Sequence, residues 1–289
     1  MSDRAVEVLL LLASGERGRA ADLAAGSSGP LCAALAMFLE AEASGAVYDE
    51  AVAFQAFISH GTNPRLYERT IAAVAEVQRD REPRSVLDIG CGDGRVTVGS
   101  LTSSVTRLDL VEPAGALLAE AVSRVAGEVE IRARQVGVEE FLATASSATD
   151  GGDLWDLVQS TFAMHNLAPA DRRAVWAELA RRTGTLVIAE FDVPELIDRS
   201  EEHCRYLAGR YAIGIAEYAD HPEVVQGFLM PVLIGQLEPG APRYTFEQPV
   251  DRWAAELEEA GFTVSRRSIV PYWWADTWLL IAESAVQVR

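Results

Sequence analysis

The sequence predicts an α/β fold, a seven-stranded doubly wound sheet with an N-terminal helical cap and a helical insertion after the fifth strand. Three observations predict it. From residue 84 onward, short apolar runs suited to buried strands alternate with helical patterns, as in parallel sheets. A glycine-rich turn follows the first run at residues 90–94. The segment after the fifth run is too long for a simple connection.

The N-terminal region, residues 1–80, is helical in pattern. Its Ala- and Leu-rich segments are broken by glycines and prolines, at 26–30 and 61–64 for example. We therefore expect a helical cap, not a second sheet. The apolar helices between Ala5 and Leu39 support either a homodimer contact or packing on the chain's own domain.

Residues 81–289 form the predicted sheet domain. Alternating patterns and turn residues place its strands at Val86–Ile89, Arg107–Val111, Glu130–Arg134, Leu154–Gln159, Thr185–Glu190, Thr263–Val270 and Thr277–Ala282. The insertion, residues 194–248, reads as helices followed by a loop with Pro and Gly. Open α/β sheets bind ligands outside the carboxyl ends of their strands, so the cap and the insertion are both candidates for a lid over the site.

Composition narrows the classes of function. No run approaches the roughly 18 apolar residues that span a membrane, and we expect a cytoplasmic protein. A formal net charge of −18 disfavours a nucleic-acid partner. All 25 basic residues are arginine, which excludes Schiff-base and Walker-lysine chemistry. The three cysteines, Cys32, Cys91 and Cys204, show no metal-binding spacing, and we expect no metal.

The strongest motif is the glycine turn after the first strand, Val-Leu-Asp-Ile-Gly-Cys-Gly-Asp-Gly at 86–94. Its glycines allow a tight turn and a close approach of the backbone to a ligand. Asp88 places a carboxylate at the start of the turn, where it would attract a cationic amino group and repel a pyrophosphate. The spacing G-x-G-x-G also differs from the G-x-G-x-x-G of dinucleotide sites.

A second acid, Glu112, closes the second strand about 20 residues after the glycines and is followed by Pro113. A carboxylate there can accept hydrogen bonds from both hydroxyls of a ribose. Together, the turn and Glu112 predict a site for a nucleoside that carries an amino-acid group.

On these residues the chain resembles the class I S-adenosylmethionine (SAM) dependent methyltransferases over roughly residues 84–284. The resemblance implies a Rossmann-like sheet with a reversed final strand, SAM as methyl donor and S-adenosylhomocysteine as product. It places the methionine moiety at Asp88 and Gly90 and the ribose at Glu112. The cofactor contacts we expect are Asp88, Gly90, Cys91, Gly92, Gly94, Glu112, Pro113, Val138, Glu139 and Ser160.

The adenine contact departs from the family pattern. The usual Asp after the third strand is replaced here by Gly137 or Val138. Two alternatives remain open: a backbone amide with Val138, or the carboxylate of Glu139.

A histidine and a glutamate end two neighbouring strands. His165 follows the fourth strand and Glu190 closes the fifth, so both lie at the carboxyl edge of the predicted sheet. A glutamate there can orient the imidazole and stabilise the imidazolium, and we predict a general-base pair. The arrangement resembles the His and Glu pair of polyketide-synthase C-methyltransferase domains. The alternative is a helix-start histidine that only packs.

Acceptor contacts are expected from aromatic and arginine side chains of the cap, the insertion and the last turn: Phe57, Tyr67, Tyr206, Arg210, Tyr211, Trp273 and Trp274. Each group has a structural alternative. Phe57 fits a helix core, the insertion residues fit a solvated helix face, and the tryptophans fit packing against the cap or a dimer partner.

The sequence thus predicts a methyltransferase acting on a small, apolar or aromatic metabolite, with C- or O-transfer favoured over N-transfer. The lysine-free, Arg- and Ala-rich composition is associated with bacterial pathways of specialised-metabolite and antibiotic biosynthesis. Two alternatives stay open. The protein could use SAM for a cyclisation or decarboxylation without methyl transfer, or it could be a non-catalytic SAM-binding partner protein.

Overall fold

The computed structural model describes residues 3–44, 50–125, 129–146 and 153–285. The chain forms two compact units, each built from three segments. The sheet unit comprises Leu66–Pro194, Tyr244–Pro271 and Asp276–Arg289. The helical unit comprises Met1–Arg65, Glu195–Arg243 and Tyr272–Ala275.

The sheet has seven strands in the order β3-β2-β1-β4-β5-β7-β6. Among the strands of the described residues, β7 alone runs against its neighbours, β5 and β6, which confirms the predicted fold class. The strands are β1 (Ser85–Ile89), β2 (Arg107–Val111), β3 (Glu130–Arg134), β4 (Trp155–Thr161), β5 (Thr183–Asp192), β6 (Thr263–Val270) and β7 (Asp276–Glu283).

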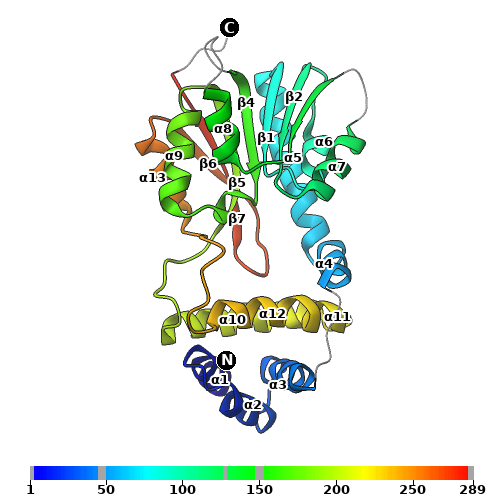
Figure 1. Cartoon of the computed structure of the whole chain (residues 1–289), viewed down its shortest axis with the longest axis vertical. Helices are drawn as coiled ribbons and strands as arrows, with labels where there is room; N and C mark the ends of the chain where they lie inside the picture. Colours follow the sequence, from blue (N-terminus) through cyan, green and yellow to red (C-terminus); the bar gives the residue numbers. More distant parts are fainter. Residues whose placement is uncertain (1–2, 45–49, 126–128, 147–152, 286–289) are drawn as a thin grey trace. The chain divides into compact units, whose positions relative to one another are not determined.

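Helices cover both faces of the sheet (Figure 1). They are α5 (Asn63–Arg81), α6 (Arg95–Ser100), α7 (Gly115–Arg124), α8 (Val138–Ser146), η1 (Met164–Asn166), α9 (Pro169–Leu179) and α13 (Val250–Glu259). Successive strand residues point to opposite faces, so β1 supplies both cores. Leu87 and Ile89 pack with residues of α8, α9 and α13, whereas Val86 packs with residues of α5, α6 and α7. Asp88 has the parity of Val86 and lies on the α5 and α6 face.

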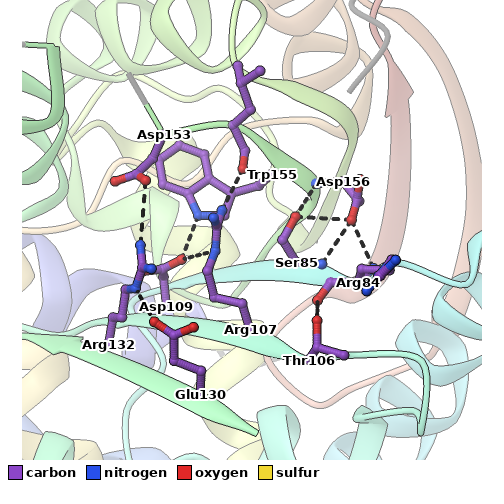
Figure 2. Close-up of polar contacts among 11 residues, drawn as sticks. Arg84, Ser85, Thr106, Arg107, Asp109, Glu130, Arg132, Asp153, Trp155 and Asp156 are labelled. Atoms are coloured by element: carbon purple, nitrogen blue, oxygen red, sulfur yellow. Dashed lines mark hydrogen bonds and ion pairs between the residues drawn. The ribbon is translucent and has the colours of Figure 1, made fainter. Parts of the chain in front are cut away.

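A polar network closes the amino edge of the sheet (Figure 2). The Asp156 carboxylate accepts hydrogen bonds from the backbone N–H groups of Arg84 and Ser85, both at 2.8 Å. The Trp155 indole donates to Asp109 at 2.8 Å, and burial raises the pKa of Asp109. These contacts tie the starts of β1, β2 and β4 together and leave the carboxyl edge for the site.

The helical unit contains both the predicted cap and the predicted insertion. Its helices are α1 (Asp3–Ala13), α2 (Arg17–Ala25), α3 (Pro30–Ala43), α4 (Glu50–Ser59), α10 (Glu201–Glu217), α11 (Pro222–Val224), the π-helical turn η2 (Val225–Leu229) and α12 (Met230–Leu237). Helix α1 contacts α2, α3, α10 and α12. Cap and insertion therefore share one core.

Three side chains join the three segments of the helical unit. The amide nitrogen of Asn63 donates to the Tyr218 hydroxyl at 2.6 Å. The Tyr272 hydroxyl donates to the amide oxygen of Asn63 at 2.9 Å. Asn63 is buried, so both bonds are shielded from water and specify how the segments meet.

The division between the units falls within α5, at residue 65. The helical pattern of the sequence placed the end of the cap at residue 80, but Val74 and Val77 are buried in the core that α5 and α6 form with the sheet. The apolar stripe of α5 thus belongs to the sheet unit. In the chain that the structure describes, no helix is long and apolar enough to cross a membrane.

Candidate active site

The turn after β1 requires glycine at three positions, and the environment differs from one position to the next. All three have positive φ, 66° at Gly90, 55° at Gly92 and 76° at Gly94, a region that favours glycine. A Cβ at Gly90 would overlap the Ala163 side chain, and one at Gly94 would lie 2.8 Å from the Cα of Ala121. At Gly92 a Cβ would meet nothing within 4 Å. The backbone at Gly92 is therefore open to a ligand.

Glu112 lies directly beside this turn. Its side chain accepts a hydrogen bond from the Gly92 N–H at 3.1 Å and another from the Ala114 N–H at 2.9 Å. Each carboxylate oxygen therefore uses one lone pair on the backbone and keeps capacity for a further donor. The fold thus brings the glycine turn and Glu112, which are about 20 residues apart in the sequence, into direct contact.

Asp88 is almost completely buried, with 1% of its surface exposed. Its Oδ2 accepts from the Thr97 hydroxyl at 2.6 Å and from the Gln159 side-chain amide at 2.7 Å. Its Oδ1 has no hydrogen-bond partner among the described residues. Burial raises the pKa of Asp88 to about 6, and the nearby charge of Glu112 adds to the rise. A buried carboxylate with an unpaired oxygen fits an ammonium group.

The other predicted cofactor residues take different positions. The Ser160 hydroxyl donates to the carbonyl of Ile89 at 2.8 Å and so ties β4 to β1. Cys91 is buried, and burial raises the pKa of its thiol. Pro113 is exposed. At the start of α8, the Val138 side chain packs in the core while Glu139 is exposed.

His165 and Glu190 form a hydrogen-bonded pair. The imidazole Nδ1 lies 2.9 Å from Glu190 Oε2, and the backbone N–H of His165 donates to Oε1 at 3.1 Å. Glu190 is 1% exposed and the His165 side chain 13% exposed. Burial acts to lower the pKa of His165, but the Glu190 carboxylate outweighs it, and the pKa is raised. Both oxygens of Glu190 hold one residue, so the ring is fixed.

Further hydrogen bonds from Phe246 and Arg172 hold the segment around His165. The Phe246 N–H donates to the His165 carbonyl at 2.6 Å. Arg172 donates to the carbonyls of Leu167 and Phe246 at 3.1 and 3.3 Å. Since Arg172 is buried and paired with Glu256, these carbonyls have a fixed donor.

Tyr67 is the one predicted acceptor contact in the sheet unit. The Arg95 guanidinium lies 4.8 Å from the centre of its ring, within the range of a cation–π contact. Arg95 is itself paired with Asp93 of the glycine turn at 2.7 Å. Tyr67 thus lies next to the turn.

The remaining predicted acceptor contacts gather in the helical unit. Trp273 lies 6.4 Å from Phe57 and 5.8 Å from Tyr211, measured between ring centres. Trp274 lies 5.9 Å from Tyr206. These five rings form the aromatic cluster. Arg210 donates to the Tyr272 carbonyl at 2.7 Å, and the buried indole nitrogen of Trp273 has no partner in the described part of the chain.

The sequence did not point to Thr97 and Gln159, the two donors to Asp88, or to Gln78, which donates to Gln159. Gln159 is a polar residue in an apolar strand, and the parallel register places it opposite Asp88. That register joins segments 71 residues apart and has no local signal.

Comparison with known proteins identifies the fold. No protein-family model matches the sequence, and no curated protein matches it. Among solved structures, the chain is similar to the N-methyltransferase NodS from Bradyrhizobium japonicum WM9 in complex with S-adenosyl-L-homocysteine. The identity is 13%, the TM-score 0.50, and the match covers 78% of this chain and 88% of NodS.

A second similar structure is an O-methyltransferase family protein from Burkholderia thailandensis. Here the identity is 17%, the TM-score 0.50, and the match covers 76% of this chain and 56% of that chain. At such identities the two comparisons establish the methyltransferase fold.

Proposed function

We propose that this protein is a SAM-dependent methyltransferase that acts on a small molecule. One observation carries the proposal: the open glycine turn, Glu112 and the unpaired oxygen of Asp88 lie together at the carboxyl edge of β1 and β2. The fold is that of known methyltransferases, and one of them was solved with S-adenosyl-L-homocysteine.

The residues fit this cofactor by their chemistry. Asp88 has an unpaired oxygen and no cationic partner among the described residues, and SAM carries an ammonium group. Glu112 keeps lone pairs for ribose hydroxyls. Two carboxylates at one turn would repel the pyrophosphate of a dinucleotide. For adenine we propose the backbone amide at Val138, with Glu139 as the alternative.

Bound SAM supplies a methyl group on a sulfonium, an excellent leaving group. The chain's own contribution is alignment and a base. In the neutral tautomer that donates from Nδ1 to Glu190, the Nε2 of His165 carries a free lone pair. It can take a proton from an acidic O–H or C–H group, and Glu190 stabilises the imidazolium. We therefore favour O- or C-methylation, because an amine with a lone pair needs no base.

For the acceptor we propose an apolar or aromatic metabolite, recognised by side chains of the helical unit. The aromatic cluster supports this assignment, since such side chains bind flat apolar ligands well. We also propose a role in bacterial specialised metabolism, which assays with a panel of candidate acceptors test. A homodimer through the cap helices is proposed as well, and light scattering tests it.

The experiment that tests the proposal is calorimetric titration of the purified protein with SAM, S-adenosylhomocysteine and NAD. We expect micromolar binding of the two sulfur ligands and none of NAD. NAD binding, or no binding of any ligand, would refute the proposal. With an acceptor in hand, a product mass larger by one methyl group distinguishes methyl transfer from a cyclisation or decarboxylation.

A further inference from the structure

A chain of buried polar side chains runs from α5 to Asp88. Gln78 of α5 donates from its amide nitrogen to the amide oxygen of Gln159 at 2.9 Å. Gln159 of β4 donates in turn to Asp88 Oδ2 at 2.7 Å. Gln78, Gln159 and Asp88 are each at most 1% exposed. An amide pair at this depth costs free energy unless its hydrogen bonds are made.

The direction of this chain is set by its far end. The Ser100 hydroxyl donates to the Val96 carbonyl at 2.8 Å, so its oxygen is left to accept from the Gln78 nitrogen, 3.5 Å away. Gln78 presents its NH2 group to both Ser100 and Gln159, and its own amide oxygen has no hydrogen-bond partner among the described residues. Gln159 then has its oxygen occupied and its NH2 group facing the carboxylate. A flipped Gln159 would place a carbonyl against Asp88.

We propose that Gln78 and Gln159 are positioning residues for cofactor binding, which hold Asp88 by one oxygen and leave the other for the ammonium group of SAM. This inference rests on the proposed function. Thr97 donates to the same oxygen at 2.6 Å, so every donor that the described residues bring to Asp88 reaches Oδ2. In this arrangement Oδ2 of Asp88 is held by the protein, and Oδ1 is left to bind the ligand.

The groups around Asp88 decide how easily it ionises, and its hydrogen-bond donors are neutral. Helix α5 contributes Gln78, α6 contributes Thr97, β4 contributes Gln159, and all three are neutral. The charged group is Glu112, directly after β2, which raises the pKa of Asp88, and the thiol of Cys91 lies at the turn. The two neutral donors to Asp88, Thr97 and Gln159, therefore oppose burial in keeping Asp88 ionised, and Gln78 acts through Gln159. Removing one of them must raise its pKa further.

The test is the pH profile of SAM affinity, measured by calorimetry between about pH 5 and 9 on the full chain. Wild-type affinity should fall as the pH drops through about 6. In Gln159→Leu the midpoint should rise by about one to two pH units, the effect of one charge-assisted hydrogen bond. Gln78→Leu acts one bond farther away and should raise it by roughly half a unit.

Gln226→Leu is the matched control. Gln226 is also buried, but it lies in the helical unit and donates to the Ala34 carbonyl at 3.2 Å. Its profile should match that of the wild type. Circular dichroism confirms that each variant is folded, and Gln78→Leu tests the inference if Gln159→Leu does not fold.

The outcomes separate the two proposals. Wild-type protein that binds no SAM at any pH overturns the proposed function and this inference with it. Wild-type binding with an unmoved midpoint in the folded Gln variants overturns the inference alone. A uniform loss of affinity at every pH would also overturn it, because a merely structural role predicts that result.

Discussion

Asp88 is a residue at which the needs of binding and of stability conflict. Its pKa in the folded chain is about 6, above the 3.8 of an ordinary aspartate. The folded state therefore binds the proton more tightly than the unfolded state. It follows that ionised Asp88 destabilises the fold above about pH 6, and that this cost disappears as the pH falls below the unfolded pKa.

Replacing this carboxylate should stabilise the protein and weaken SAM binding. We expect Asp88→Asn to raise the free energy of unfolding at pH 8 by about 1–3 kcal/mol, since an amide has no ionisation cost. The difference from wild type should vanish near pH 4. SAM affinity should fall at least about tenfold. Urea unfolding at the two pH values, with calorimetry, checks both parts; a variant that is less stable at pH 8 contradicts the argument.

His165 should affect turnover and leave cofactor binding intact. His165→Asn is expected to lower kcat by roughly 10² to 10⁴ fold, because it removes the base. Wild-type turnover should also fall as the pH drops through the raised pKa of His165, since only the neutral ring accepts a proton. Steady-state rates with labelled SAM measure both effects. The variant Asn166→Ala, at the exposed neighbouring residue, is the control. An unaltered kcat in His165→Asn would show that His165 is not the base.

The pairing of His165 and Glu190 could be predicted from sequence, but the surroundings of Asp88 could not. Neighbouring parallel strands end at the same edge, so the ends of β4 and β5 had to meet. The partners of Asp88 depend instead on the register of β1 against β4 and on the rotation of α5. Neither quantity has a local signature in the chain.

At the scale of elements, Arg172 of α9 and Glu256 of α13 form a buried ion pair. Arg172 donates through Nε and Nη2 to the two carboxylate oxygens at 2.8 and 2.9 Å. The Trp176 indole donates to the same carboxylate at 3.3 Å, and Arg172 lies over the Trp253 ring. Two helices on one face of the sheet are thereby joined. The sequence gives no sign of this pair, because Arg172 and Glu256 each lie within an ordinary amphipathic helix.

Breaking this pair should destabilise the sheet unit strongly. We expect Arg172→Met to lower the free energy of unfolding by about 3–5 kcal/mol, because Glu256 is left buried and unpaired. The double variant Arg172→Met/Glu256→Gln should recover part of that loss. Thermal and urea unfolding measure the changes, with the exposed Arg173→Met as control. Equal stability of Arg172→Met and Arg173→Met would show that the pair contributes nothing.

The strands and the organisation of the helices differed in how well the sequence predicted them. All seven strands lie where the sequence patterns indicated them: apolar runs mark the buried central strands such as β1, and alternation marks the less buried edge strands β3 and β6. The union of cap and insertion in one unit was not foreseen. It depends on contacts such as Asn63 with Tyr218 and Tyr272, which join residues up to 209 positions apart.

At the scale of the whole molecule, the two proposed binding tasks fall on different units. The proposed ribose and methionine contacts lie in the sheet unit, whereas the aromatic cluster lies in the helical unit. Each unit has its own buried core. Damage to the helical core should therefore affect use of the acceptor while SAM binding persists.

Leu9→Asp tests this division. Leu9 of α1 is fully buried at 0% exposure, and an unpaired charge there should disrupt the helical unit. We expect SAM affinity to stay within about threefold of wild type, since the sheet unit keeps its own core, and kcat/KM for the acceptor to fall by more than about 10² fold. Met37→Asp, at a site 55% exposed on α3 of the same unit, should change neither. Loss of SAM binding in Leu9→Asp together with cooperative loss of the sheet would mean that the two units fold as one, and the assignment of acceptor recognition to the helical unit would then need a different basis.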